Sequence, residues 1–145
     1  MTEYAYSHVM IIDDSEIDVL VSRRLMELTH FASHVTITST GEEAVDFLKN
    51  EVANAEQTPE IILLDMHLPG MSGFDFIRLF KTLPEFIVNK TKIVVLSAYQ
   101  KQEEIEKLFE NKFIAGQLDK PLTQESLKKL LSWKSEGVGV SAGDQ

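Results

Sequence analysis

The chain has 145 residues, a length typical of one domain with a full hydrophobic core, and its 43% of apolar residues is ordinary for a soluble globular protein. A net charge of −9 at pH 7 would repel the phosphates of a nucleic acid, so we expect no nucleic-acid partner. The sequence has no cysteine, no basic N-terminal leader and no apolar stretch long enough to span a bilayer. We therefore expect a cytoplasmic protein without disulfides, thiolate chemistry or membrane insertion.

The first half of the chain alternates between predicted strands and predicted helices. Apolar residues over 8–12 and the β-branched alternation over 34–38 predict two strands. A helix is predicted over 15–29, with Ser15 as its cap, and Gly41 opens a second helix. The residues that we expect on the inner face of the first helix, at three- and four-residue steps, are Ile17, Leu20, Val21, Leu25 and Leu28.

The second half continues this alternation with three apolar runs and three helical patterns. We expect Pro84 to break or restart the first of these helices, because proline lacks the backbone N–H that a helix interior requires. Strands are predicted over 61–64, 92–96 and 113–119, and helices around 74–80 and over 100–111 and 123–133.

The strict alternation of strands and helices predicts the fold. Connections of this kind are nearly always right-handed and give a parallel sheet with helices on both faces. The natural arrangement is an α/β fold with a doubly wound, five-stranded parallel sheet in the flavodoxin-like order 2-1-3-4-5. We expect this domain over residues 8–133, after an N-terminal extension over 1–7. Residues 134–145 lack periodicity and are predicted to form a disordered tail.

Four of the five predicted strands end in residues that suit a phosphoryl group. Asp13 and Asp14 follow the first strand, and Asp65, Ser97 and Lys120 end the third, fourth and fifth. Because the carboxyl ends of parallel strands meet at one edge, these side chains should share one pocket. The clustered carboxylates repel one another, which protonation of one carboxyl or binding of a cation such as Mg²⁺ would relieve. An aspartate can act as a nucleophile, a hydroxyl can donate to a phosphoryl oxygen, and an ammonium can bind one.

Each of these residues also has a purely structural interpretation. Asp14, Ser15 and Ser97 could cap helices, Asp65 could cap a turn, and Lys120–Pro121 could mark a turn. The agreement among all four strand ends favours the functional interpretation. The histidines lack metal-ligand spacing and are predicted to be structural or solvated: His8, His30, His34 and His67.

The motifs at these strand ends resemble those of the receiver domain of two-component response regulators. They read IIDDS at 11–15, LLDMHLPGMSG at 63–73, VVLSA at 94–98 and DKP at 119–121. The resemblance extends over almost everything from His8 to Trp133.

The resemblance implies a role for each strand-end residue. Asp65 would be the phosphoacceptor, and Ser97 and Lys120 would contact the phosphoryl group. Mg²⁺ would be held by Asp13, Asp14, Asp65 and the backbone carbonyl of His67. The family also implies a cis peptide bond between Lys120 and Pro121, although few X–Pro bonds are cis in general.

One position departs from the family pattern. Receiver domains often have Tyr or Phe three residues before the lysine, as a rotamer switch coupled to the hydroxyl residue, but here this residue is Gln117. We therefore expect a smaller rearrangement on phosphorylation, concentrated in the loop 97–100. Tyr99, within this loop, either borders the pocket or is an exposed loop residue.

The leading hypothesis is a single-domain response regulator, similar to chemotaxis regulators, rather than an enzyme. It would accept a phosphoryl group from a sensor histidine kinase or a histidine phosphotransfer protein, bind a downstream protein target, and be a monomer or weak dimer. One alternative is an Mg²⁺-dependent phosphohydrolase with an aspartate nucleophile, although His67 stands where such enzymes have a second acid. Further alternatives are a flavodoxin-like cofactor binder and an adaptor of the same fold that is never phosphorylated.

Overall fold

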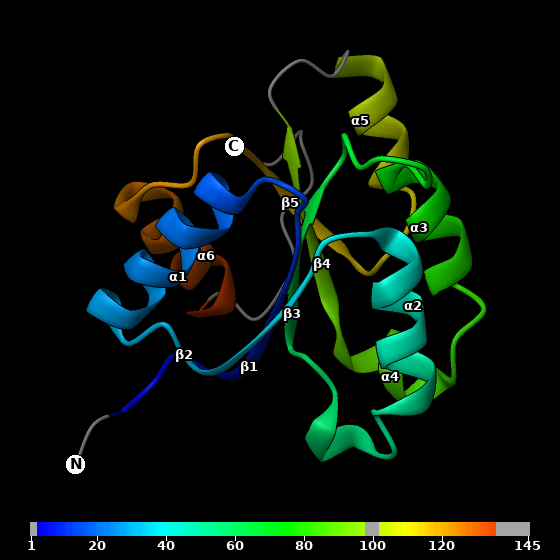
Figure 1. Ribbon diagram of the computed structural model, residues 1–145, viewed down its shortest axis with the longest axis horizontal. Helices are drawn as coiled ribbons and strands as arrows, with labels where there is room; N and C mark the ends of the chain where they lie inside the picture. Colours follow the sequence, from blue (N-terminus) through cyan, green and yellow to red (C-terminus); the bar gives the residue numbers. More distant parts are fainter. Residues whose placement is uncertain (1–2, 98–101, 136–145) are drawn as a thin grey trace.

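The computed structural model describes residues 3–97 and 102–135, which form one five-stranded sheet covered by helices (Figure 1). All strands are parallel, in the order β2-β1-β3-β4-β5, so the predicted fold class is confirmed. The elements are β1 (Tyr6–Ile12), α1 (Glu16–Thr29), β2 (Ala32–Thr38), α2 (Gly41–Asn50), the 3₁₀ helix η1 (Ala55–Gln57), β3 (Ile61–Asp65), α3 (Gly73–Phe80), α4 (Glu85–Lys90), β4 (Lys92–Ser97), α5 (Gln102–Leu108), β5 (Ile114–Asp119) and α6 (Gln124–Ser135).

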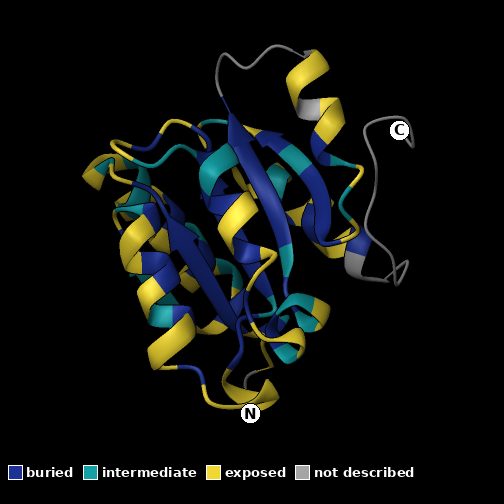
Figure 2. Cartoon of the chain, turned by 90° about the vertical axis from the view of Figure 1, so that its right-hand side faces the viewer, coloured by how far each residue is buried: buried dark blue, intermediate teal, exposed yellow. Residues whose placement is uncertain are grey.

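The two faces of the sheet carry separate apolar cores. Helices α1 and α6 cover one face, and α2, α3, α4 and α5 cover the other (Figure 1). Alternate residues of β3 divide between them, with Leu63 in the core under α1 and α6 and Leu64 in the core under the other helices. Figure 2 shows the buried strands in dark blue behind helices whose outward surfaces are exposed. The sheet is thus buried on both sides, and its carboxyl edge is where side chains of several strands can meet.

The register of the strands brings the predicted site residues to that edge. Ile12 at the end of β1 is level with Leu64, so Asp13, directly after β1, and Asp65, the last residue of β3, lie at the same height. Asp65 is in turn level with Leu96, one residue before Ser97. Ser97 is paired with Asp119, one residue before Lys120.

Several element boundaries differ from the predicted ones. Strand β1 begins at Tyr6, within the predicted extension, because the buried Tyr6 ring packs against Phe31. Helix α6 continues to Ser135, two residues into the predicted tail. Residues 136–145 and residues 98–101, which include Tyr99, lie outside the described residues. Pro84 restarts the helix, because α3 ends at Phe80 and α4 begins directly after the proline.

The predicted inner face of α1 is wrong for Ile17, Leu20, Val21 and Leu28, whereas Leu25 packs against the core as predicted. Ile17, Leu20 and Leu28 are 75%, 67% and 70% exposed, whereas Ser22 and Met26 are the buried residues of this helix. Apolar residues occur at helical spacing around much of α1, so their periodicity did not tell which of them faces the sheet. Among the described residues no helix is both long and apolar enough to cross a membrane.

Candidate functional site

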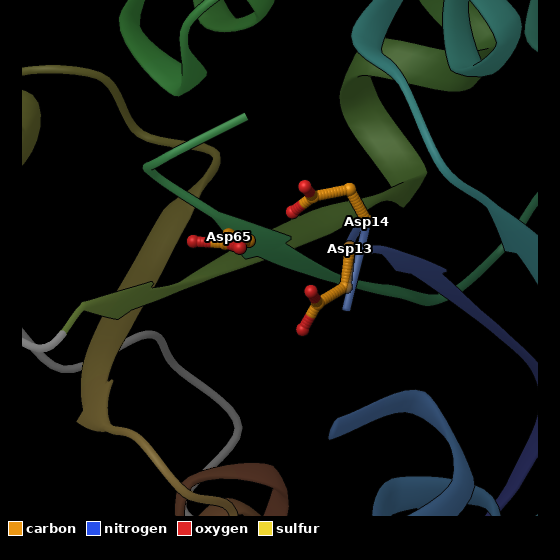
Figure 3. Close-up of side chains that lie close together, drawn as sticks. All are labelled: Asp13, Asp14 and Asp65. Carbon is orange, nitrogen blue, oxygen red and sulfur yellow. The ribbon is translucent and has the colours of Figure 1, made fainter. Parts of the chain in front are cut away.

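Three carboxylates lie together at the carboxyl edge of the sheet, as predicted. The side-chain oxygens of Asp13, Asp14 and Asp65 come within 4.8 Å of one another (Figure 3). Asp13 and Asp65 are 4% and 3% exposed, whereas Asp14 is exposed to solvent. Oxygen ligands of this number and kind suit a hard divalent cation such as Mg²⁺.

The backbone after each strand orients the two buried carboxylates. The N–H of Ser15 donates to Asp13 Oδ1, and the N–H of His67 donates to Asp65 Oδ1, each at 2.9 Å. Ser15 also caps α1 as predicted, because its Oγ accepts from the N–H of Asp18 at 3.2 Å. Each buried carboxylate therefore has one oxygen fixed by the main chain and the other directed into the pocket.

Lys120 joins the carboxylates at the centre of the site. Its Nζ lies 3.1 Å from Asp65 Oδ2, 3.3 Å from Asp13 Oδ2 and 2.9 Å from Asp18 Oδ2. The peptide bond between Lys120 and Pro121 is cis, which confirms the expectation from the family. The backbone N–H of Lys120 donates to the carbonyl of Ser97 at 3.3 Å, so the lysine and the hydroxyl residue are held in adjacent strands.

The electrostatics of the pocket favour an additional positive charge. Burial raises the pKa of Asp13, despite the N–H of Ser15 and the ammonium of Lys120. Burial opposes the charge of Lys120, but Asp18, Asp13 and Asp65 together raise its pKa above the usual value. Two carboxylates at 4.8 Å, the upper limit of the separations in this cluster, would repel by about 3.5 kcal/mol at an effective dielectric constant of about 20. The ammonium of Lys120 contacts three aspartates, and Asp14 adds a fourth carboxylate nearby, so negative charge remains that a cation would neutralise.

Ser97 closes the pocket from β4 and has an unexpected neighbour. Its side chain is 3% exposed, and its Oγ accepts a hydrogen bond of 2.9 Å from Nε2 of Gln117. Gln117 is the residue that replaces the aromatic ring common in the family. The sequence indicated that the ring is absent but not that the amide contacts Ser97.

Close packing supports the loop that follows Asp65. A Cβ on Gly73 would lie 2.8 Å from the Cα of Met66, so only glycine fits where α3 begins against the end of β3. Gly70 adopts a φ of +75°, which glycine tolerates better than other residues. Ser72 and Asp75 form a capping box at the start of α3. The loop is therefore fixed at both ends around Asp65.

A second polar region lies away from this pocket, between β1, β2 and α2. His8 is 7% exposed; its Nδ1 donates to the carbonyl of Gln57 at 3.1 Å, and its Nε2 lies 2.7 Å from Thr36 Oγ1. Parallel pairing brings His8 beside His34, with the ring centroids 4.7 Å apart. A cavity of about 320 Å³ is lined by Ser7, His8, His34, Phe47, Glu51, Glu56 and Gln57.

The site contains one residue that the sequence reasoning did not include, Asp18, and one contact that it did not predict, between Gln117 and Ser97. Asp18 contacts Lys120 from the first turn of α1, and Gln117 contacts Ser97 from β5. Asp18 lies in the first turn of α1, a few residues after Asp13 and Asp14, and this proximity in the sequence could have indicated it. The Gln117 contact depends on strand register, which the sequence does not specify directly.

Comparison with known proteins defines the family. The sequence profile described as the response regulator receiver domain matches residues 9–132 of this chain. The chain therefore belongs to the response regulator receiver domain family, whose members are phosphoacceptor signalling modules of two-component systems.

Individual relatives agree with this assignment. The chain is 31% identical over 136 residues to the autoinducer 1 sensor kinase/phosphatase LuxN of Vibrio campbellii, covering 92% of this chain but 14% of that protein. It is 28% identical to the two-component response regulator ARR3 of Arabidopsis thaliana, over 93% of this chain and 58% of the relative. The chain thus spans only part of the length of these relatives.

The solved structures show the same fold. A two-component response regulator from Cytophaga hutchinsonii is 27% identical with a TM-score of 0.81, covering 93% of this chain and 99% of that one. The receiver domain of the sensor histidine kinase PA1611 from Pseudomonas aeruginosa PAO1, described with a magnesium ion coordinated in its active site cleft, is 20% identical with a TM-score of 0.70. That match covers 90% of this chain and 99% of that one.

Proposed function

We propose that Asp65 of this chain accepts a phosphoryl group from a phosphohistidine and that the phosphorylated form binds a downstream protein. The observation that carries this proposal is the contact of Lys120 Nζ with Asp65 Oδ2 and Asp13 Oδ2 in one buried pocket. An ammonium so placed can bind an oxygen of a phosphoryl group on Asp65. Ser97, at the neighbouring strand end, is the second donor available to that group.

The residues present fit a magnesium ion. Asp13, Asp14, Asp65 and the backbone carbonyl of His67 would hold it, as oxygen ligands at the pocket where negative charge is in excess. When bound, the ion would neutralise the carboxylates and the phosphoryl oxygens. The magnesium ion of the Pseudomonas aeruginosa receiver domain supports this assignment.

The transfer itself needs little covalent chemistry from the chain. An oxygen of Asp65 attacks the phosphorus, the bond from phosphorus to the histidine nitrogen breaks, and an acyl phosphate forms on Asp65. The main-chain N–H of His67 fixes the carboxylate for this attack through its hydrogen bond to Oδ1. The contacts of Lys120 and Ser97 then hold the charge that the arriving group brings.

The donor protein would dock on α1. We call its exposed apolar residues the α1 stripe: Ile17, Leu20, Val21 and Leu28. The first turn of the same helix reaches the pocket through Asp18, so a protein on the stripe lies next to Asp65. A histidine kinase or phosphotransfer protein must deliver its phosphohistidine there, and an apolar patch beside a reactive pocket is typical of a docking surface. The downstream target would use the surface formed by α5, β5 and α6, with the chain a monomer or weak dimer.

Intact-mass measurement with a small acyl phosphate and Mg²⁺ tests the central proposal. Wild type should gain one phosphoryl group that is stable in acid and labile to hydroxylamine, and Asp65→Asn should gain none. Asp46→Asn, an exposed aspartate on α2, is the matched control and should behave like wild type. Phosphorylated Asp65→Asn would move the acceptor elsewhere. Wild type that stays unmodified would indicate the non-phosphorylated adaptor, and steady turnover of a phosphomonoester would indicate the hydrolase.

A further inference from the structure

The side chain of Gln117 reaches the phosphoryl pocket because of an irregularity in β5. Ile93 pairs with Ile114, but the next residue, Val94, pairs with Gly116, so β5 contains one extra residue at this point. Gln117 consequently lies level with Val95 rather than with Leu96. Side chains alternate along a strand, so this shift places Gln117 on the same face as Val95 and Ser97.

Packing on the opposite face supports the irregularity. A Cβ on Gly116 would lie 2.3 Å from the ring of Trp133, so the indole of α6 packs directly against the β5 backbone there. β-Bulges are over-represented next to functional sites, where they redirect a side chain, although they are rare between parallel strands such as β4 and β5. Here it directs a polar amide to Ser97 instead of into the apolar core under α1 and α6.

The hydrogen bond between Gln117 and Ser97 has a defined direction. Nε2 of Gln117 donates to Ser97 Oγ at 2.9 Å, so the amide occupies one lone pair of the hydroxyl. A serine hydroxyl has a single proton, and this bond does not use it. The proton is therefore available to an acceptor, and phosphoryl oxygens on Asp65 are acceptors only. Accepting one hydrogen bond also makes a hydroxyl a better donor of another.

We propose that Gln117 is a positioning residue for phosphorylation. Its amide holds Ser97 so that the hydroxyl proton is donated to the phosphoryl group as it arrives on Asp65. Gln117 thus acts on Ser97 by a directed hydrogen bond, not by the movement of a ring. This inference rests on the proposed function, in which Asp65 is the phosphoacceptor.

A double-mutant cycle between Gln117 and Ser97 tests the inference. The variants are Gln117→Met, which keeps the length of the side chain without its donor, Ser97→Ala, and both together. The measured quantity is the rate at which a small acyl phosphate modifies the protein at saturating Mg²⁺, followed by intact mass. Gln117→Met should slow the reaction about three- to tenfold, the range of one ordinary hydrogen bond. In the Ser97→Ala background it should slow it no further.

Two measurements separate positioning from a loss of folding. Gln124→Met, an exposed glutamine at the start of α6, is the matched control and should react like wild type. The side-chain amide resonance of Gln117 should shift when a phosphoryl mimic binds wild type and should not shift in Ser97→Ala. A purely structural role for Gln117 would not make this resonance depend on the hydroxyl.

The outcomes distinguish this inference from the proposed function. If wild type is phosphorylated and Gln117→Met reacts as fast, only the role of Gln117 is overturned. The same holds if Gln117→Met slows the reaction equally with and without the Ser97 hydroxyl. If wild type is not phosphorylated at all, the proposed function is overturned together with the inference.

Discussion

Helices α1 and α2 have similar sequence patterns and opposite environments. Both carry apolar residues at helical spacing and acidic residues in the first turn. Helix α2 packs Ala44 and Leu48 against the sheet with no exposed surface, whereas Ile17 and Leu20 of α1 are mostly exposed. The difference shows that an amphipathic pattern predicts a helix but does not tell whether its apolar residues face the core or a partner.

The position of the pocket is consistent with a recognition role for the exposed apolar residues of α1. The helix follows Asp13 and Asp14 directly, and its Asp18 contacts Lys120. Helix α2 begins after β2, at the edge of the sheet, and contributes mainly to the core. We therefore infer that the apolar residues of α2 stabilise the fold, while those of the α1 stripe serve recognition.

The largest expected effect is the difference in stability between truncations of the two helices. Leu48→Ala should lower the free energy of unfolding by about 2–5 kcal/mol, because it removes buried methyl groups and leaves a cavity. Leu20→Ala makes the same chemical change at an exposed position and should alter stability by less than about 0.5 kcal/mol. Urea unfolding of both variants measures this. Equal losses would show that Leu20 is buried in solution and would remove the basis for the α1 stripe.

Much of the fold was predictable because short apolar runs, each followed by turn residues, alternate with helical patterns along the sequence. The five strands, their order and the convergence of Asp13, Asp65, Ser97 and Lys120 follow from β-α alternation and the geometry of parallel sheets. The same reasoning predicted that the lysine and the carboxylates share one pocket. These features depend on local sequence patterns and on general rules of topology, both of which can be applied to a single sequence.

The remaining features depend on the register between strands and on the rotation of helices about their axes, which are hard to predict from a single sequence. The bulge in β5 determines which face of the sheet Gln117 lies on, and no local sequence motif predicts this bulge. The rotation of α1 decides that Ser22 rather than Leu20 faces the sheet. The pairing of His8 with His34 requires knowing that the first two strands are adjacent and in that register.

Magnesium binding should increase the local stability of the start of α1 more than that of α2. At a hundred times its dissociation constant, Mg²⁺ should raise the free energy of unfolding by about 2.7 kcal/mol, because it binds the folded carboxylate cluster. Hydrogen exchange should slow at the junction of β1 and α1, next to Asp13 and Asp14, and change little in α2. Melting with Mg²⁺ and with a chelator gives the stability change. Identical midpoints would contradict a metal site at these aspartates.

The α1 stripe should matter only for a protein donor. Leu20→Glu should slow phosphorylation by a cognate phosphotransfer protein or kinase about tenfold, or 1.4 kcal/mol, because it places a charge in the apolar contact. The same variant should react with a small acyl phosphate at the wild-type rate, because the pocket itself is unchanged. Glu43→Leu, an exposed substitution on α2, is the comparison on the other helix and should leave both rates unchanged. Equal slowing with both donors would place the defect in the pocket rather than in docking.

The smallest expected effect concerns His8, whose ring packs against Phe47 of α2 with centroids 6.2 Å apart. Burial lowers the pKa of His8, although its hydrogen bond to the Gln57 carbonyl opposes this. The folded protein therefore binds the proton less readily than the unfolded chain, in which the pKa of histidine is about 6.5.

The pH dependence of stability follows from this difference in proton binding. The His8 contribution is fully present above about pH 6.5 and is lost as the pH falls from there through the lower pKa of the folded state. Urea unfolding between about pH 7.5 and pH 5 should show this loss in wild type and a weaker one in His8→Gln. An unchanged pH dependence in His8→Gln would show that a group other than His8, outside the contact with α2, is responsible for the loss.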